Sequence, residues 1–140
     1  MDEIDKDILL HLQENARYSF AELGRKVGLS TPAVNERVRK LEEKEIIVGY
    51  KAIINPEKID KPIMAYILYD NTKCEPFAAF CKNHPSVIEC HRLAGSYNYL
   101  IKVLTDSVQS LENFIDASMS FGQPTTLIRL SSPVEGKSIN

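Results

Sequence analysis

The sequence predicts an α+β protein built from two modules, a helical one at the N-terminus and a mixed one of strands and helices after it. Two short amphipathic segments, Phe20–Val27 and Thr31–Glu43, lie on either side of Gly28 and predict two helices joined by a tight turn. Beyond Pro62 the hydrophobic pattern switches repeatedly between the periods of strand and helix. A chain of 140 residues is long enough for two small domains.

The first expected helix covers Asp2–Asn15. Asp2 is a suitable N-cap, and further acidic residues in the first turn suit the positive end of the helix dipole. Its apolar stripe consists of Ile4, Ile8, Leu9 and Leu12. With the two helices that follow, it completes a three-helix unit large enough to hold the turn rigid.

The turn between the second and third helices has the signals of a helix-turn-helix. Ser19 and Glu22 form a capping box, and Gly28 is suited to the left-handed end of a helix. Ser30 or Thr31 then caps the next helix. The buried stripe of that helix consists of Val34, Val38 and Leu41. Two short helices joined by a glycine turn are typical of a DNA-reading motif.

The opposite face of the third helix carries side chains suited to DNA. Between Ala16 and Lys40 there are six basic and two acidic residues, whereas the whole chain has 17 basic and 19 acidic residues and a net charge of −2. The candidates for contacts at or beside base edges are Ser30, Thr31, Asn35, Glu36 and Arg39. The candidates for phosphate contacts are Arg25, Lys26, Arg37 and Lys40. A solvated helix face would have similar charges, so it is the turn and the caps that favour DNA binding.

The chain after Glu45 changes to an extended, β-branched pattern. Residues 46–54 predict a strand pair, which beside a recognition helix would form a wing. Asn55-Pro56 and Asp60-Lys61-Pro62 then mark a boundary. We therefore expect a winged helix-turn-helix DNA-binding domain over 1–47, a wing or linker strand over 48–60, and a second domain over 61–140.

The second module follows the order βαββαβ of a ferredoxin-like fold, an antiparallel sheet with two helices on one face. The expected strands are Ile63–Tyr69, Val87–Leu93, Tyr99–Leu104 and Thr126–Ser131, and the expected helices are Glu75–Asn83 and Ser107–Met119. The first and third strands are apolar on both faces, although two helices can cover only one. The other face is expected to pack on a second copy, and the alternative is that the wing or a terminus covers it.

These motifs resemble the winged helix of the leucine-responsive/asparagine-regulator (Lrp/AsnC) family of prokaryotic transcription factors. The resemblance is carried by Leu29-Ser30, Val34, Arg37-Val38, Leu41-Glu42, Ile46-Ile47 and Gly49-Tyr50, preceded by Asp5, Ile8-Leu9 and Leu12. It extends over essentially the whole chain. Where the family usually has a glycine this chain has Glu45, so we expect about 1 kcal/mol of strain there or a different end to the helix.

The resemblance also implies that the second module, over 61–140, is an effector-binding and oligomerisation domain, because in such regulators it binds an amino acid at contacts between dimers. The matching loop is Gly95–Asn98, in which Gly95 permits close backbone approach. Its polar groups are those of Ser96, Tyr97 and Asn98, and Thr126 is a weaker candidate for the same pocket. The family often has aspartates where Ser96 and Asn98 stand, and neutral side chains hold an ammonium group less tightly. A hairpin turn without a ligand fits the same residues.

The sequence shows no catalytic constellation, so we expect neither an enzyme nor a metal or other cofactor. The three cysteines are interpreted as small buried hydrophobes, and the absence of a long apolar run or a secretion signal favours the cytoplasm. The predicted function is a sequence-specific transcriptional regulator that binds double-stranded DNA as a homo-oligomer (a dimer, tetramer or octamer) and is modulated by an amino acid. The alternatives are an architectural DNA-wrapping protein without an effector, and an amino-acid sensor acting through a protein partner.

Overall fold

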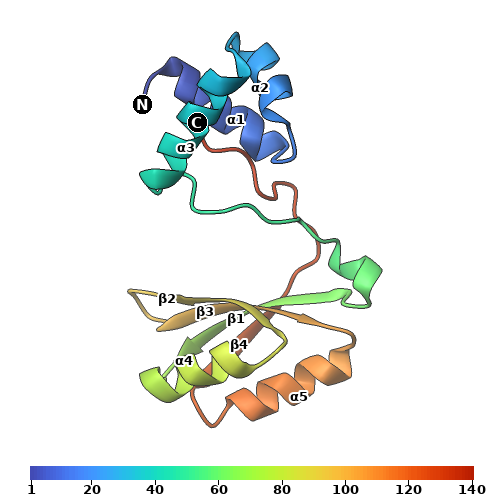
Figure 1. Ribbon diagram of the computed structural model, residues 1–140. Coiled ribbons are helices and arrows are strands. Elements are labelled where there is room, and N and C mark those ends of the chain that lie inside the picture. Colours follow the sequence, from blue (N-terminus) through green and yellow to red (C-terminus); the bar gives the residue numbers. More distant parts are fainter. The chain divides into compact units, whose positions relative to one another are not determined.

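The computed structural model describes residues 1–140, which divide into two compact units (Figure 1). The first unit comprises Met1–Ile53 together with Val134–Asn140, and the second comprises Ile54–Pro133. No helix combines the length and the apolar character needed to cross a lipid bilayer.

The first unit is the predicted three-helix unit, with α1 over Glu3–Glu14, α2 over Phe20–Val27 and α3 over Thr31–Glu43. The expected stripes of α1 and α3 and the apolar side of the amphipathic α2 point into one core. Its fully buried members, at most 3% exposed, are Ile8, Leu23, Val34, Val38 and Leu41. The amphipathic periodicity of the sequence therefore located the faces of all three helices correctly.

The segment after α3 does not form the strand pair expected for a wing. Residues 46–55 contain no strand, and the chain continues to a short 3₁₀ helix, η1, at Pro56–Ile59. Val48 is 91% exposed and Ile53 is 97% exposed. A β-branched run becomes a strand only when a neighbouring strand accepts its backbone hydrogen bonds, and this chain places none beside it. The prediction of a wing is therefore wrong for the chain on its own.

The C-terminal tail packs with the first unit. The side-chain amide of Gln13 donates to the carbonyl oxygen of Ile139 at 3.0 Å, and the backbone N–H of Ile139 donates back to Gln13 Oε1 at 2.8 Å. The sequence alone had placed residues 134–140 with the second module. Both ends of the chain therefore belong to the helical unit.

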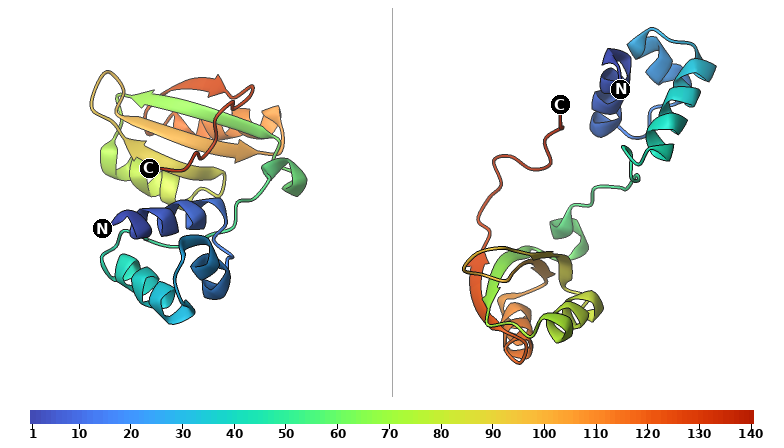
Figure 2. Two further views of the ribbon diagram at one scale, coloured as in Figure 1. Left: turned by 90° about the horizontal axis from the view of Figure 1, so that it is seen from above. Right: turned by 90° about the vertical axis from the view of Figure 1, so that its left-hand side faces the viewer.

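The second unit has the predicted βαββαβ order. Its elements are β1 (Ile63–Asp70), α4 (Cys74–Asn83), β2 (Val87–Arg92), β3 (Tyr99–Thr105), α5 (Val108–Ser118) and β4 (Gln123–Ile128). The strands lie in the order β2-β3-β1-β4, every neighbouring pair is antiparallel, and both helices cover the same face (Figure 2). The core under the helices includes Ile67, Tyr69, Phe77, Ile101 and Phe114.

The last strand begins earlier than the sequence suggested. It starts at Gln123 and ends at Ile128, whereas we expected a break at Gln123-Pro124 and a strand over 126–131. Pro124 is tolerated because β4 is an edge strand, which pairs only with β1 and needs no hydrogen bond on its outer side.

The face of the sheet away from the helices has an apolar area formed by β1, β3 and β4. Leu68 on β1 lies opposite Leu100 on β3, both half-buried, and Leu127 on β4 is 51% exposed. Lys102 lies among them, with its ammonium 5.9 Å from the centre of the Tyr66 ring. The prediction that β1 and β3 are apolar on both faces is confirmed apart from Lys102, whereas β2 adds Glu89 and His91 to the open face.

The three cysteines differ in their surroundings. Cys81 is 3% exposed, and burial raises the pKa of its thiol to about 12. Cys74 and Cys90 are exposed, so the interpretation of all three as buried hydrophobes is wrong for these two. Cys74 is seven positions before Cys81, but it is the first residue of α4 and is not part of the core.

Candidate nucleic-acid interface

The turn between α2 and α3 has the geometry that the sequence indicated. Ser19 Oγ accepts from the Glu22 N–H at 3.1 Å, and a Glu22 carboxylate oxygen accepts from the Ser19 N–H at 2.8 Å. Gly28 ends α2 with φ at 73°, in the left-handed region. Of the two candidate caps for α3, it is Ser30 that accepts from the Ala33 N–H, at 3.4 Å. The turn is therefore fixed at both ends by side-chain and backbone caps.

Gly24 is a residue of the motif whose role the sequence reasoning missed. A Cβ at this position would lie 2.5 Å from the carbonyl oxygen of Leu29, so only glycine allows the turn to fold back onto α2. Its own carbonyl oxygen accepts from the Leu29 N–H at 2.9 Å. The available signal was its place four residues before Gly28, on the side of α2 that meets the turn.

The exposed face of α3 carries most of the predicted DNA-binding side chains. Thr31, Asn35, Glu36, Arg39 and Lys40 are all exposed, and Ser30 lies at the start of the same helix. Arg25 and Lys26 occupy the last turn of α2 and are exposed as well. The structure therefore gathers these candidates on one helix-turn-helix unit.

Two carboxylates hold Arg39. Its Nε and Nη2 donate to Glu36 at 3.0 and 2.7 Å, and its Nη1 donates to Glu43. The hydrogen bond from Arg39 lowers the pKa of the Glu36 carboxyl, and the Glu36 carboxylate raises the pKa of Arg39. Lys40 also approaches Glu36, at 3.6 Å. Glu43 was not among the sequence candidates, although its spacing of four residues from Arg39 on one helix was the available signal.

Arg37 connects α3 to the start of α1. Its Nη1 donates to Asp5 at 2.8 Å and to both carboxylate oxygens of Asp2, at 3.0 and 2.9 Å. These hydrogen bonds raise the pKa of Arg37. The pKa of Asp2 is lowered, first by the Asp5 N–H and then by Arg37. Arg37, which the sequence predicts to contact a phosphate, thus also supports the position of α3. Its Nε and Nη2 make no hydrogen bond within the chain.

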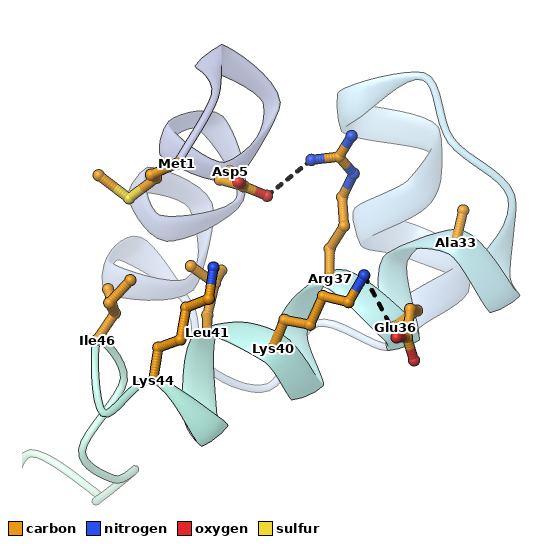
Figure 3. Close-up of a pocket in the computed structure, with 9 residues that line it drawn as sticks. All are labelled: Met1, Asp5, Ala33, Glu36, Arg37, Lys40, Leu41, Lys44 and Ile46. Carbon is orange, nitrogen blue, oxygen red and sulfur yellow. Dashed lines mark hydrogen bonds and ion pairs between the residues drawn. The ribbon is translucent and has the colours of Figure 1, made fainter.

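A groove of about 410 Å³ lies between the start of α1 and α3 (Figure 3). Lys40 of α3 and Lys44, the residue at the C-cap of α3, line it, and Arg37 extends across it toward Asp5. Its apolar part consists of Met1, Leu41 and Ile46. Lys44 is a cation that the sequence analysis did not select, although it follows Lys40 by one helical turn.

The end of α3 explains the departure at Glu45. The Ile46 N–H donates to the Leu41 carbonyl and the Glu45 N–H to the Glu42 carbonyl, both at 2.9 Å, which is a Schellman motif. This motif requires a left-handed residue, and Glu45 supplies it with φ at 55°. Tyr50 then donates to Glu42 at 2.9 Å. Of the two expected outcomes, the structure has the strained Glu45 and not a different helix end.

In the second unit, the candidate effector loop Gly95–Asn98 joins β2 to β3. Gly95 has φ at 141°, a conformation that favours glycine. The backbone of Asn98 donates to Tyr69 and accepts from Leu93, both at 2.7 Å, and its side chain accepts from the Thr72 N–H at 3.4 Å. The carboxamide of Asn98 is thus partly committed to the fold.

The other candidates of this loop are less engaged. Ser96 is exposed, Tyr97 is half-buried, and neither side chain makes a hydrogen bond within the chain. Thr126 lies in the middle of β4, opposite Ile67, and makes no hydrogen bond to the loop. The structure does not bring Thr126 into the loop. No group of three His, Cys, Asp or Glu side chains could hold a metal ion.

Comparison with known proteins extends over both units. Residues 1–42 match the AsnC-type helix-turn-helix domain, and residues 65–139 match the Lrp/AsnC ligand binding domain. The chain is 53% identical over 132 residues to the HTH-type transcriptional regulator YezC of Bacillus subtilis, covering 94% of this chain and 95% of that protein. It is 33% identical to the regulator LrpC of the same organism, covering 94% and 92%.

Solved structures agree with the matches to these two domains and regulators. The structure of Bacillus subtilis LrpC has a TM-score of 0.91 at 32% identity and covers 98% of this chain and 99% of that one. A transcriptional regulator from Neisseria meningitidis in complex with L-Met has a TM-score of 0.92 at 28% identity, covering 100% and 96%. The fold and the exposed α3 define a helix-turn-helix transcriptional regulator with a ligand-binding domain. The chain belongs to the Lrp/AsnC family, as the sequence motifs indicated.

Proposed function

We propose that this regulator recognises a specific DNA sequence by inserting α3 into the major groove. The observation that carries the proposal is the exposed face of α3, fixed by a capped turn on one side and by Arg37 on the other. The residues at or beside base edges are Ser30, Thr31, Asn35, Glu36 and Arg39. The residues that hold phosphates are Arg25, Lys26, Arg37 and Lys40, to which the groove adds Lys44.

The protein would act as a homo-oligomer built on the free face of the sheet. Leu68, Leu100 and Leu127 give this face an apolar surface that neither helix of the second unit covers. A second copy packed face to face would bury it, and a two-fold dimer would present two α3 helices to two half-sites of an operator. Tetramers or octamers would arise by association of such dimers. As a regulator of chromosomal DNA, the protein would reside in the cytoplasm.

An amino acid is the proposed effector, and the loop Gly95–Asn98 is its proposed contact. The regulator from Neisseria meningitidis was solved with L-Met, which supports an amino-acid ligand for this domain. Ser96 and Tyr97 have polar groups free for such a ligand, whereas Asn98 already binds the Thr72 N–H. The proposal assigns no catalytic step to the chain.

The test is fluorescence anisotropy with the DNA upstream of the protein's own gene and with a random duplex of equal length, over a salt series. We expect tight binding that survives excess random competitor and weakens steeply with salt, because each neutralised phosphate releases counterions. Addition of single amino acids should then change the affinity for the upstream duplex. Equal affinity for both duplexes would favour an architectural protein, and no binding at low salt would favour a sensor acting through a protein partner.

A further inference from the structure

The guanidinium of Arg39 is divided between two carboxylates from different turns of α3. Glu36 takes the side edge of the guanidinium, since Nε and Nη2 donate to its two oxygens at 3.0 and 2.7 Å. Glu43 takes Nη1, which belongs to the opposite, outer end of the group. The side edge is therefore fully occupied, and at the outer end the second N–H of Nη2 has no partner within the chain.

All three side chains lie on the exposed face of α3. Their exposed fractions are 49% for Glu36, 50% for Arg39 and 56% for Glu43, so water and DNA can reach each of them. Ion pairs at such exposure are weak and exchange readily with another acceptor. The bidentate pair with Glu36 is geometrically the stronger of the two, because two parallel N–H groups meet two oxygens.

The N–H groups at the outer end of Arg39 match the acceptors of one base. Guanine presents O6 and N7 as adjacent acceptors in the major groove, and an arginine satisfies them with two N–H groups. The outer end of Arg39, formed by Nη1 and Nη2, becomes such a pair once Glu43 withdraws. Glu36 can remain bound to the side edge while this happens, because its hydrogen bonds use other N–H groups of the guanidinium.

Resting on the proposed DNA-binding function, we propose that Glu36 is a positioning residue that aims Arg39 at a guanine, and that Glu43 is a competitor which that guanine displaces. The two carboxylates also discriminate between acceptors. A phosphate approaching Arg39 is repelled by the negative charges of both carboxylates. The acceptors of guanine have no net charge and are repelled much less. The arrangement therefore disfavours random phosphate contact and favours base reading at this position.

A simpler role for the two acids makes a different prediction. If Glu36 and Glu43 only repelled DNA by their charge, removing either one would tighten binding to every sequence by a similar factor. In the proposed arrangement the two removals differ. Loss of Glu43 frees the outer end of Arg39, whereas loss of the Glu36 carboxylate frees Arg39 to turn toward phosphates and so reduces discrimination.

The experiment compares Glu36→Gln, Glu43→Gln and Arg39→Ala, each alone and each glutamine variant combined with Arg39→Ala. Glu14→Gln on α1 is the matched control, with the same charge change outside α3. The probes are a duplex enriched from a random pool by the wild-type protein and an unselected random duplex, at one fixed salt concentration. A third probe replaces each guanine of the enriched duplex in turn by 7-deazaguanine, which lacks the N7 acceptor.

We expect Glu43→Gln to tighten binding to the enriched duplex about two- to fivefold and binding to the random duplex by less, because Glu43 competes with guanine for Arg39 through an exposed ion pair. Glu36→Gln should lower the ratio of enriched to random affinity about five- to tenfold, because a bidentate base contact is no longer aimed. One 7-deazaguanine position should weaken binding of the wild type and not of Arg39→Ala. In the Arg39→Ala background neither glutamine variant should change the affinity ratio.

The inference is overturned if both glutamine variants shift both duplexes equally, if their effects on the ratio persist without Arg39, or if no 7-deazaguanine position distinguishes the wild type from Arg39→Ala. A wild-type protein that enriches no sequence and shows no salt-dependent binding overturns the proposed function instead, and the inference with it. Circular dichroism of each variant separates a loss of folding from a loss of recognition.

Discussion

Glu45 occupies the left-handed position of the Schellman motif that ends α3, with φ at 55°. A left-handed conformation costs an L-residue about 1–2 kcal/mol, because its Cβ crowds the neighbouring carbonyl. Glycine has no such cost, but it loses about 0.5–1 kcal/mol more conformational freedom on folding. Glu45→Gly should therefore stabilise the helical unit by about 0.5–1 kcal/mol. For a unit of this size, that corresponds to about 2–8 °C in Tm.

The assay is urea unfolding of the full chain followed by circular dichroism, with the thermal midpoint measured by calorimetry. Glu45→Ala is the control, because it removes the same negative charge from the end of the helix but keeps the Cβ. We expect the glycine variant to be more stable than the alanine variant. If alanine stabilises as much as glycine does, the gain comes from charge and the argument from backbone strain is refuted.

Three further changes test the fold and its pH dependence. Gly24→Ala should destabilise the helical unit by about 1–3 kcal/mol in urea unfolding, because the new Cβ would lie 2.5 Å from a backbone oxygen. The control is Gly49→Ala, which should change stability by less than about 0.5 kcal/mol because there is open space around Gly49. Equal effects of the two substitutions would contradict the packing argument. Tyr69→Phe should cost about 1 kcal/mol, because it removes a buried hydrogen bond of 2.7 Å to Ser118, and an unchanged urea midpoint would speak against that contribution. Burial lowers the pKa of His84 below the ordinary 6.5, so the contribution of His84 to stability should be complete above pH 6.5 and be lost as the pH falls below that value. His84→Gln should reduce this loss of stability at low pH. An unchanged pH profile would assign the loss to other groups.

The sequence located some parts of the molecule well for a local physical reason. The capping box at Ser19, the left-handed Gly28 and the stripe through Val34 depend on residues within one or two turns of each other, and the structure confirms all three. The expected departure at Glu45 was of the same kind, since the end of a helix is fixed by a few neighbouring backbone groups.

Other parts depended on contacts between distant residues. The β-branched run after Glu45 has strand propensity, yet it forms no strand because the chain supplies no partner. Pro124 looked like a breaker, and it is tolerated because β4 lies at an edge of the sheet. Only the folded chain shows that its C-terminal residues pair with Gln13.

The candidate site shows the same division. The sequence by itself determined the two modules, the face of α3 that is exposed and the types of side chain on it, because helical periodicity and caps are local properties. It did not determine that Arg37 is bound by acids of α1, because this ion pair joins residues more than 30 positions apart. Nor did it determine that Arg39 is shared between Glu36 and Glu43, since i,i+3 and i,i+4 spacings permit several pairings. Tertiary structure decided which charges are already paired before DNA arrives, because that depends on how rotamers and neighbouring helices fit together in space.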